Sequence, residues 1–443
     1  ELRALRQRVA ELERRQAGAA AADRFAADRA VADVLADADR RSRQLQAGGF
    51  TAGYSGGRFL IQSEDGNFVL NPNLIAQFRY VADWREGGKN GGADDDTQSG
   101  FEVRRLRLNL DGNAFSPSLT YHVQWATSRT GGNLVLEEAW ARWQFEKTPF
   151  AVRAGTFADT WAHETGVHTG RQLAVDRSVP HEIFAGGLTG TENYVQGVEL
   201  QVQPTDDLRA AVSYHDGFNS RNTAFTDAGG GSPPLGLNNV QWGVAARAEY
   251  KLAGDWRNYG DFSALGTKKD LLVIGAGGDV DAADGVTAYF HTADVQWEPA
   301  SVPGLSVFAA YYGLLRDVRR PAAGTTGSPY DWGAVVQVGY LIGGGDGAGA
   351  GYWEVFGRYS YTALDAAAPG GAGTLGAAAR TNDAVHEITL GVNRYFRGHA
   401  AKLTVDVTYL PTGSPLDLNG VGILAQPSDD PQVVFRGQFQ LML

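Results

Sequence analysis

The sequence lacks several features that mark common classes of protein. It contains no cysteine in 443 residues, which excludes disulfides, thiolate metal sites and cysteine nucleophiles together. No segment approaches the roughly 18 to 20 consecutive apolar residues of a transmembrane helix, so a helical membrane protein is excluded. The formal net charge of −11 argues against a nucleic-acid-binding protein.

The segment between residues 101 and 157 instead alternates apolar and polar side chains with a period of two. Its first stretch, FEVRRLRLNLDGNAF, has one polar face and one mostly apolar face. The residues expected on the polar face are Val103, Arg105, Arg107, Asn109 and Asp111, and those expected on the opposite face are Arg104, Leu106, Leu108 and Leu110. This period indicates a β-ribbon with one face in water and the other in an apolar environment.

Such a ribbon fits either a water-soluble sandwich or a membrane barrel. In a sandwich the apolar face points inward, whereas in a membrane barrel it contacts lipid and the polar face lines a lumen. Three features favour the barrel: strands of about 10 residues, long enough to cross a bilayer when tilted, aromatic residues near the strand ends, and arginines on the polar face.

The strand pattern continues from residue 73 to residue 443. We count sixteen candidate strands there, joined alternately by tight turns and by long loops rich in Gly, Asp and Ser. The sequence therefore predicts an all-β transmembrane barrel of about 16 antiparallel strands, with both ends on the short-turn, periplasmic side. Two connections break the alternation, because 253–270 is long where a turn is expected and 281–285 is short where a loop is expected.

The first 47 residues follow a helical pattern. They contain no proline, a Gly-Gly pair at 48–49 ends them, and Leu2, Leu5, Val9 and Leu12 are spaced like the core positions of a coiled coil. We expect residues 1–47 to form a periplasmic coiled-coil helix; a solvated single helix is the alternative. Residues 48–72 then form a linker with a short hairpin between 58–63 and 68–70.

Arginines on the polar face are the first candidate functional residues. Strand parity places Arg79, Arg105, Arg107, Arg142 and Arg153 on the lumen side of the first five strands. A stripe of guanidinium groups lowers the barrier for anions and repels cations. Alternatively, each arginine pairs with a lumen carboxylate, such as Asp83, Asp111 or Glu138, and only braces the wall.

The connection 158–192 is the second candidate, because a long loop after the fifth strand that folds inward would set the narrowest radius. Trp161 and Phe184 could anchor it, and opposed charges across it would orient a solute. Its candidate constriction residues are Asp159, His163, Glu164, His168, Arg171, Asp176 and Arg177. The spacing of His163 and His168 does not match a zinc motif, so we expect solvated loop histidines, no metal site and no cofactor.

The stretches RRLRLNLDG, YHVQW and LEEAWARWQF, followed by Arg153, Gly155 and Phe157, resemble the phosphate-selective porin O and P family. The resemblance is good from residue 74 to 157 and is carried mainly by strand spacing beyond that. It implies a sixteen-stranded trimeric barrel, a third extracellular loop folded into the pore, and arginines along the permeation path. Family members that prefer phosphate use a lysine-rich constriction, whereas this chain has only six lysines, most of them in predicted loops or rims.

Taken with the residue pattern, the resemblance predicts an outer-membrane porin for passive diffusion of small hydrophilic solutes or ions, anion-preferring through the lumen arginines. The alternative is a structural protein that tethers the outer membrane to the cell wall through residues 1–47. We expect contacts with outer-membrane lipid and with copies of itself in a homotrimer, and a cell-wall or periplasmic partner for residues 1–47. An enzyme is not expected, because no serine is evidently paired with His122 or His215.

Overall fold

The structure is a computed structural model, and it describes most of the chain from residue 49 onward. The described residues are 8–9, 11, 49–55, 58–87, 96–128, 131–186, 193–218, 220, 231–232, 237–238, 240–283, 285–319, 328–342, 351–365, 383–424 and 427–443. The predicted coiled coil over 1–47 therefore lies outside the described residues, apart from Arg8, Val9 and Glu11.

Sixteen antiparallel strands form a closed barrel, which confirms the predicted fold class and strand number. The barrel strands are β3 (Val69–Arg85), β4 (Asp96–Ala114), β5 (Ser116–Thr127), β6 (Leu134–Gln144), β7 (Phe150–Ala158), β8 (Tyr194–Val202), β9 (Leu208–His215), β12 (Val240–Ala253), β13 (Leu271–Ala283), β14 (Val286–Glu298), β15 (Leu305–Val318), β16 (Tyr330–Ile342), β17 (Tyr352–Ala363), β18 (Ala384–Tyr395), β19 (Ala401–Leu410) and β20 (Gln432–Met442). Pairing of β20 with β3 closes the ring, so no barrel edge is left unpaired.

The remaining elements are short. The helices are α2 (His163–Gly166), η2 (Thr169–Arg171), α3 (Val179–Phe184), α4 (Trp256–Tyr259) and η5 (Asn419–Val421), and a two-stranded ribbon consists of β10 (Gly231–Ser232) and β11 (Leu237–Asn238). Among the described residues, none of the helices combines the length and the apolar character needed to cross a membrane.

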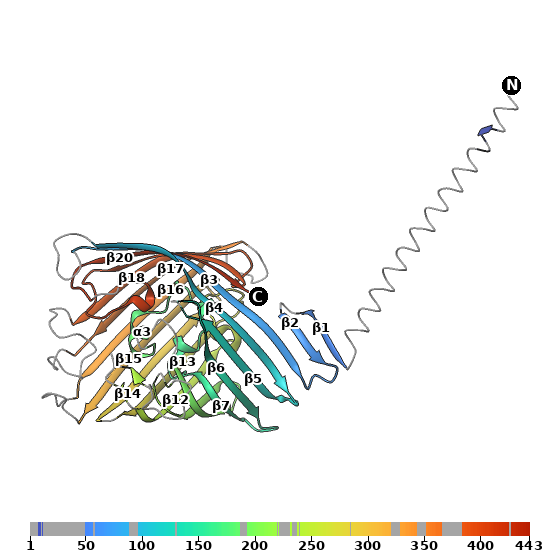
Figure 1. Ribbon diagram of the computed structural model, residues 1–443, viewed down its shortest axis with the longest axis horizontal. Helices are drawn as coiled ribbons and strands as arrows, with labels where there is room; N and C mark the ends of the chain where they lie inside the picture. Colours follow the sequence, from blue (N-terminus) through green and yellow to red (C-terminus); the bar gives the residue numbers. More distant parts are fainter. Residues whose placement is uncertain are drawn as a thin grey trace.

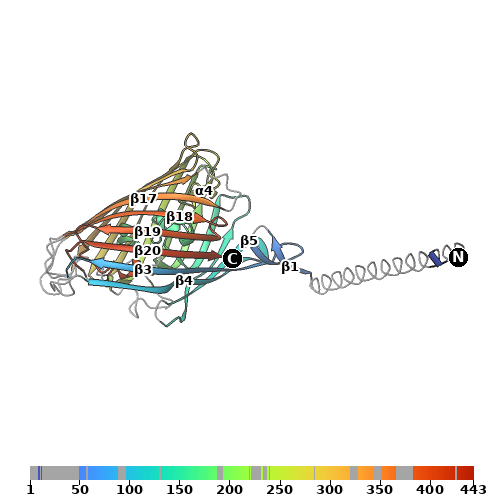
Figure 2. The ribbon, with the colours of Figure 1, turned by 90° about the horizontal axis from the view of Figure 1, so that it is seen from above.

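A hairpin precedes the barrel. Strand β1 (Phe50–Ser55) pairs with β2 (Arg58–Ser63), and β2 also pairs with the first residues of β3 through Ile61 and Leu70. The expected pairing of 58–63 with 68–70 is thus present, but its second half is the beginning of a barrel strand. The hairpin and the C-terminus lie at the same end of the barrel (Figure 2).

Tight and long connections are separated between the two ends of the barrel. The tight connections at 115, 145–149, 203–207 and 396–400 lie at the end where β3 begins and the chain ends. The long connections 86–95, 159–193, 364–383 and 411–431 lie at the other end. This asymmetry is typical of outer-membrane barrels, whose short turns face the periplasm.

The barrel is polar inside and apolar outside. Inward-facing residues include Gln337, Arg358, Glu387, Thr404, Asp406 and Gln438, all buried, whereas Leu108, Leu200, Val212, Ile274, Val336 and Leu390 are exposed on the outer wall. Exposed apolar side chains in such numbers are unfavourable in water and favourable against lipid. The aromatic residue at the end of β18, Tyr395, points inward and donates a hydrogen bond to Glu354.

Candidate functional site

The described part of the connection between β7 and β8, residues 159–186 and 193, lies inside the barrel, and we call it the inward loop. Its helix α3 packs against β15, β16 and β17, and every residue of α3 is buried. Figure 1 shows α3 within the ring of strands. A segment from the connection after the fifth barrel strand therefore occupies the lumen, where it narrows the space available to a solute.

Local sequence explains the shape of this loop. Ser178 caps α3 by accepting a hydrogen bond from the backbone N–H of His181, and Pro180 occupies the first turn, where its missing N–H costs nothing. Glu164 accepts hydrogen bonds of 2.7 Å from both the backbone N–H and the hydroxyl of Ser178. Arg177 donates to the carbonyl oxygens of Glu164 and Val167. These contacts fold the loop onto itself before it meets the wall.

The wall then satisfies backbone groups of the loop that would otherwise be buried without partners. Asp406 accepts a hydrogen bond from the N–H of Val175 at 3.0 Å, and Glu387 accepts one from the N–H of Val179 at 3.1 Å. The ammonium group of Lys402 donates to the carbonyl of Gln172 at 2.9 Å. Polar side chains on distant strands thereby fix the path of the loop.

An apolar core also holds the loop inside the barrel. On the loop it contains Trp161, Leu173, Val179, Ile183 and Phe184, and on the wall it contains Phe290, Phe308, Tyr312, Leu314 and Val335. Burial of each such side chain contributes about 1.5–3 kcal/mol. The polar lining of the lumen is therefore interrupted on β14, β15 and β16, because those strands point apolar residues at the loop.

Asp176 is the most strongly charged point of contact between loop and wall. Its carboxylate lies 2.7 Å from Arg79, 3.3 Å from Arg104, 3.5 Å from Arg436 and 3.7 Å from Arg105. Burial opposes ionisation, but the guanidinium groups of Arg79, Arg104, Arg436 and Arg105 together hold the pKa of Asp176 well below its usual range. The carboxylate is therefore charged at every physiological pH.

The inward position of Arg104 corrects an expectation from strand parity. Gln77 of β3 pairs with Arg105 of β4, and the next residue of β3, Phe78, pairs with Val103. Arg104 is therefore the extra residue of a β-bulge in β4. Because of this extra residue, Arg104 points into the lumen beside Arg105 while Val103 is exposed on the outer wall. Period-two reasoning fails at a bulge, since the parity changes there.

The five arginines predicted on the polar face fall into two groups. Arg79, Arg105 and Arg107 are buried against the inward loop, and Arg107 contacts Glu137 at 2.8 Å, Thr169 at 3.1 Å and the hydroxyl of Tyr194 at 3.0 Å.

The other two, Arg142 and Arg153, line a cavity of about 770 Å³. The strands β6, β7, β8, β9 and β12 form its wall, and the inward loop and the connection after β12 form the rest. The cavity also contains the charged groups of Glu199, Arg209, Arg247 and Glu249. Arg153 pairs with Glu199 at 2.8 Å and stacks on Phe157, while Arg142 donates to the amide oxygens of Gln201 and Gln144.

The histidines of the inward loop differ from the expected solvated residues. His163 is buried, stacks on Tyr259 with ring centroids 3.7 Å apart, and contacts Gln296 at 2.9 Å. Burial lowers the pKa of His163 to about 4, so its ring is neutral at pH 7. His168 is half-buried and accepts a hydrogen bond from the N–H of Gly170. The two rings serve the packing of the loop.

The other predicted loop residues are also dispersed. Arg171 is exposed, and its backbone carbonyl accepts a hydrogen bond from the N–H of Phe262. Glu164 and Arg177 brace the loop, and Asp159 lies where the loop leaves β7.

Sequence reasoning missed the role of the long connection 254–270, which also folds into the lumen. Asp261 of this connection contacts His399 at 2.7 Å, and Ser263 donates a hydrogen bond to Glu354. Its unexpected length at the short-turn rim was the available signal.

A closed sixteen-stranded barrel with a polar, partly filled lumen and an apolar outer wall is the architecture of outer-membrane porins. The family model described as "Phosphate-selective porin O and P" matches residues 77–257. The resemblance predicted from the sequence is thereby confirmed over that part of the chain.

Solved porins have the same fold. An anion-selective porin from Comamonas acidovorans is 11% identical, with alignment over 84% of this chain and 100% of that chain and a TM-score of 0.53. Salmonella typhi OmpF in complex with daunomycin is 15% identical over 88% and 100%, with a TM-score of 0.54. Pseudomonas putida OprB is 11% identical over 84% and 94%, with a TM-score of 0.52. No curated protein matches the chain.

Proposed function

We propose that the protein is a passive diffusion channel of the outer membrane for small hydrophilic solutes, with a preference for anions. Solutes pass through the cavity between the inward loop and the strands β6, β7, β8, β9 and β12. Its width is set by the loop, which Asp176 and the apolar core hold in place. The fold of the Comamonas acidovorans anion-selective porin agrees with this proposal, although the preference itself rests on the charges of the cavity.

One observation carries the anion preference: the guanidinium group of Arg142 has no carboxylate partner. It is held at 2.6 Å by Gln201 and at 2.8 Å by Gln144, both through neutral amide oxygens, and among the described residues it forms no ion pair. Arg153 pairs with Glu199, Arg209 pairs with Glu249, and Arg247 pairs with both Glu249 and Asp294. Arg142 is therefore a cavity arginine without an ion pair among the described residues, and its charge attracts anions.

The buried arginines have a different role in this proposal. Arg79 and Arg105 contact Asp176 of the inward loop, and Arg107 contacts Thr169 of the same loop. We assign these three side chains to positioning the loop, with an indirect effect on the permeation path. The proposal thus combines the two roles that the sequence left open: bracing by the buried arginines and attraction of anions by those at the cavity.

We also propose a homotrimer in the outer membrane, as the family resemblance implies, with residues 1–47 on the periplasmic side. The β1–β2 hairpin continues the sheet beyond the short-turn end of the barrel (Figure 2), so the chain before it starts from that side. A partner in the cell wall would bind residues 1–47, which lie largely outside the described residues.

Single-channel recording tests the proposal. The purified full chain in planar bilayers should conduct, and in a salt gradient its reversal potential should show anion preference. Arg142→Gln should lower the anion-to-cation permeability ratio about two- to fivefold, since one charge at short range in water is worth about 0.5–1 kcal/mol.

Arg257→Gln provides the control. Arg257 is exposed in the connection after β12, at the short-turn end of the barrel, and it already pairs with Asp255. It should leave the ratio unchanged. A cation-selective wild-type pore would contradict the proposed preference, and the absence of channels would contradict the proposed function.

A further inference from the structure

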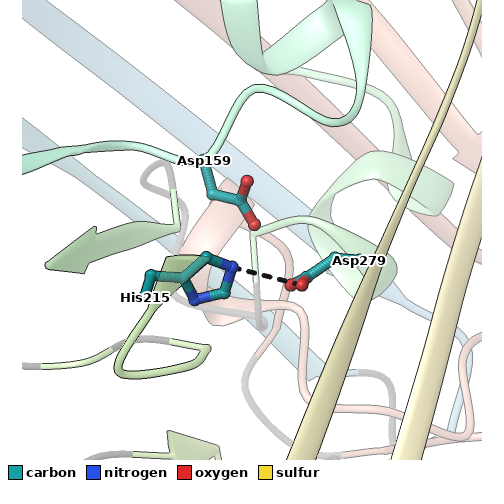
Figure 3. A group of neighbouring side chains, drawn as sticks. All are labelled: Asp159, His215 and Asp279. Atoms are coloured by element: carbon teal, nitrogen blue, oxygen red, sulfur yellow. Dashed lines mark ion pairs between the residues drawn. The ribbon is translucent and has the colours of Figure 1, made fainter. Parts of the chain in front are cut away.

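A second group of buried charges lies inside the barrel, away from the arginines. Asp159 follows β7, His215 ends β9, and Asp279 and Asp281 belong to β13, so three distant segments converge. All four residues are at least 98% buried. One donor atom each from Asp159, His215 and Asp279 lies within 4.8 Å of the others. Figure 3 shows these three side chains pointing toward one another.

The acid cluster, which consists of Asp159, Asp279 and Asp281 with His215, contains buried carboxylate oxygens that have no hydrogen-bond donor among the described residues. Both oxygens of Asp279 and one oxygen of Asp281 have no hydrogen bond among the described residues, and within that part of the chain no arginine or lysine pairs with any of the three acids. An uncompensated buried carboxylate is costly, and several together repel one another. Among the described residues, His215 is the one basic side chain beside the three acids, so their charge is not balanced within that part of the protein.

The remaining contacts leave the inner oxygens open. Asp159 accepts a hydrogen bond from the side chain of Asn193 at 3.3 Å, and Asp281 accepts one from the N–H of Phe218 at 3.1 Å. Each contact uses one oxygen and fixes the carboxyl group without neutralising it. These contacts hold Asp159 and Asp281 from outside the cluster. One oxygen of Asp281 and both oxygens of Asp279 remain without a donor among the described residues, so they can serve as ligands around an ion.

His215 orients Asp279. Its Nδ1 accepts a hydrogen bond from the N–H of Gly217 at 3.0 Å, so the neutral ring carries its proton on Nε2. Nε2 lies 3.2 Å from Asp279, but it is not aimed squarely enough at that oxygen for a regular hydrogen bond. The oxygens, and not the ring, are therefore the free ligand atoms.

Strand β12 leaves room for the cluster. Gly243 lies between His215 on β9 and Asp281 on β13, paired with both. A side chain there would meet them, because an added Cβ would lie 2.2 Å from His215 Cε1 and 2.5 Å from Asp281 Oδ1. The absence of a side chain at this position lets groups on non-adjacent strands approach one another.

We propose that the carboxylates of Asp159, Asp279 and Asp281 bind a divalent metal cation that prefers oxygen ligands, such as Ca²⁺ or Mn²⁺. Hard divalent cations take carboxylate oxygens as ligands and supply the charge that the cluster lacks. Because Asp159 begins the inward loop and the other two acids belong to the wall, the cation fastens the start of the loop to β13.

Calorimetry on the full chain in detergent, freed of metal with a chelator, tests the site with CaCl₂ and with MnCl₂. One cation should bind per chain and raise the midpoint of thermal unfolding. Asp279→Asn should weaken binding at least about tenfold. Without metal, this variant should unfold at a higher temperature than the wild type, because it removes a repulsive buried charge; a merely damaged fold would unfold at a lower one.

Asp111→Asn is the matched control. Asp111 on β4 contacts His122 on β5 at 2.5 Å. The variant therefore also removes one carboxylate from an acid–histidine pair of the barrel wall. It should bind the cation like the wild type. Failure of the wild type to bind either cation at millimolar concentration would overturn the proposal, and so would equal binding by Asp279→Asn and the wild type.

Discussion

Two buried acidic regions of the barrel differ in how their charge is balanced. At Asp176, four guanidinium groups lie within 3.7 Å of one carboxylate. In the acid cluster, three carboxylates converge with one histidine, and within the described chain no arginine or lysine pairs with them. Both regions join the inward loop to the wall. The first is complete within the protein, whereas the second needs an ion from solution.

The comparison shows that burial alone does not decide the charge of an acid. Burial raises the pKa of Asp159, and the neighbouring Asp279 raises it further, whereas the arginines lower the pKa of Asp176 despite equal burial. The difference lies in the partners, and those are supplied by strands far apart in sequence.

Removal of the charge at Asp176 should have the largest effect. Asp176→Asn leaves four guanidinium groups close together and unbalanced, so the free energy of unfolding should fall by about 3–5 kcal/mol. Guanidinium chloride titration in detergent measures it. Asp255→Asn, in an exposed ion pair with Arg257, should produce no measurable change. Equal stability of Asp176→Asn and wild type would show that the arginines are solvated and do not depend on Asp176.

Stability should also depend on Glu182, an acid of the inward loop that forms no ion pair with an arginine among the described residues. Burial, followed by the charge of Asp176, raises the pKa of Glu182 to about 7. The folded protein then holds a proton that the unfolded chain releases near its ordinary pKa of 4.5. The free energy of unfolding should therefore fall as pH rises through this window, by at most about 3 kcal/mol.

Denaturant titrations at several pH values check this dependence. Glu182→Gln should remove it, whereas Asp176, whose pKa is lowered, should lose its contribution only at acidic pH. A wild-type curve that is flat between about pH 5 and pH 8 would contradict the raised pKa.

The smallest expected effect is that of a methyl group at Gly243. Gly243→Ala forces His215 and Asp281 apart and should lower the free energy of unfolding by about 1–3 kcal/mol, with loss of cation binding. The control is Gly437→Ala, because an added Cβ at Gly437 meets nothing within 4 Å. If both variants bind Ca²⁺ alike, the close approach across β12 is not required for the site.

The sequence by itself determined the barrel and its polarity. Alternation along each strand is local, so Leu106, Leu108 and Leu110 could be assigned to the outer wall and Arg105 and Arg107 to the lumen before any pairing was known. The alternation of tight and long connections similarly gave the strand number and the direction of the short-turn end.

Only the tertiary structure decided what fills the lumen. The bulge that turns Arg104 inward depends on the register of β4 against β3, and the balance at Asp176 depends on a loop reaching three separate strands. The acid cluster joins residues 159, 215 and 279–281, whose closeness no periodicity reveals. Local patterns fix which way a side chain points, but the partner it meets is set by long-range packing.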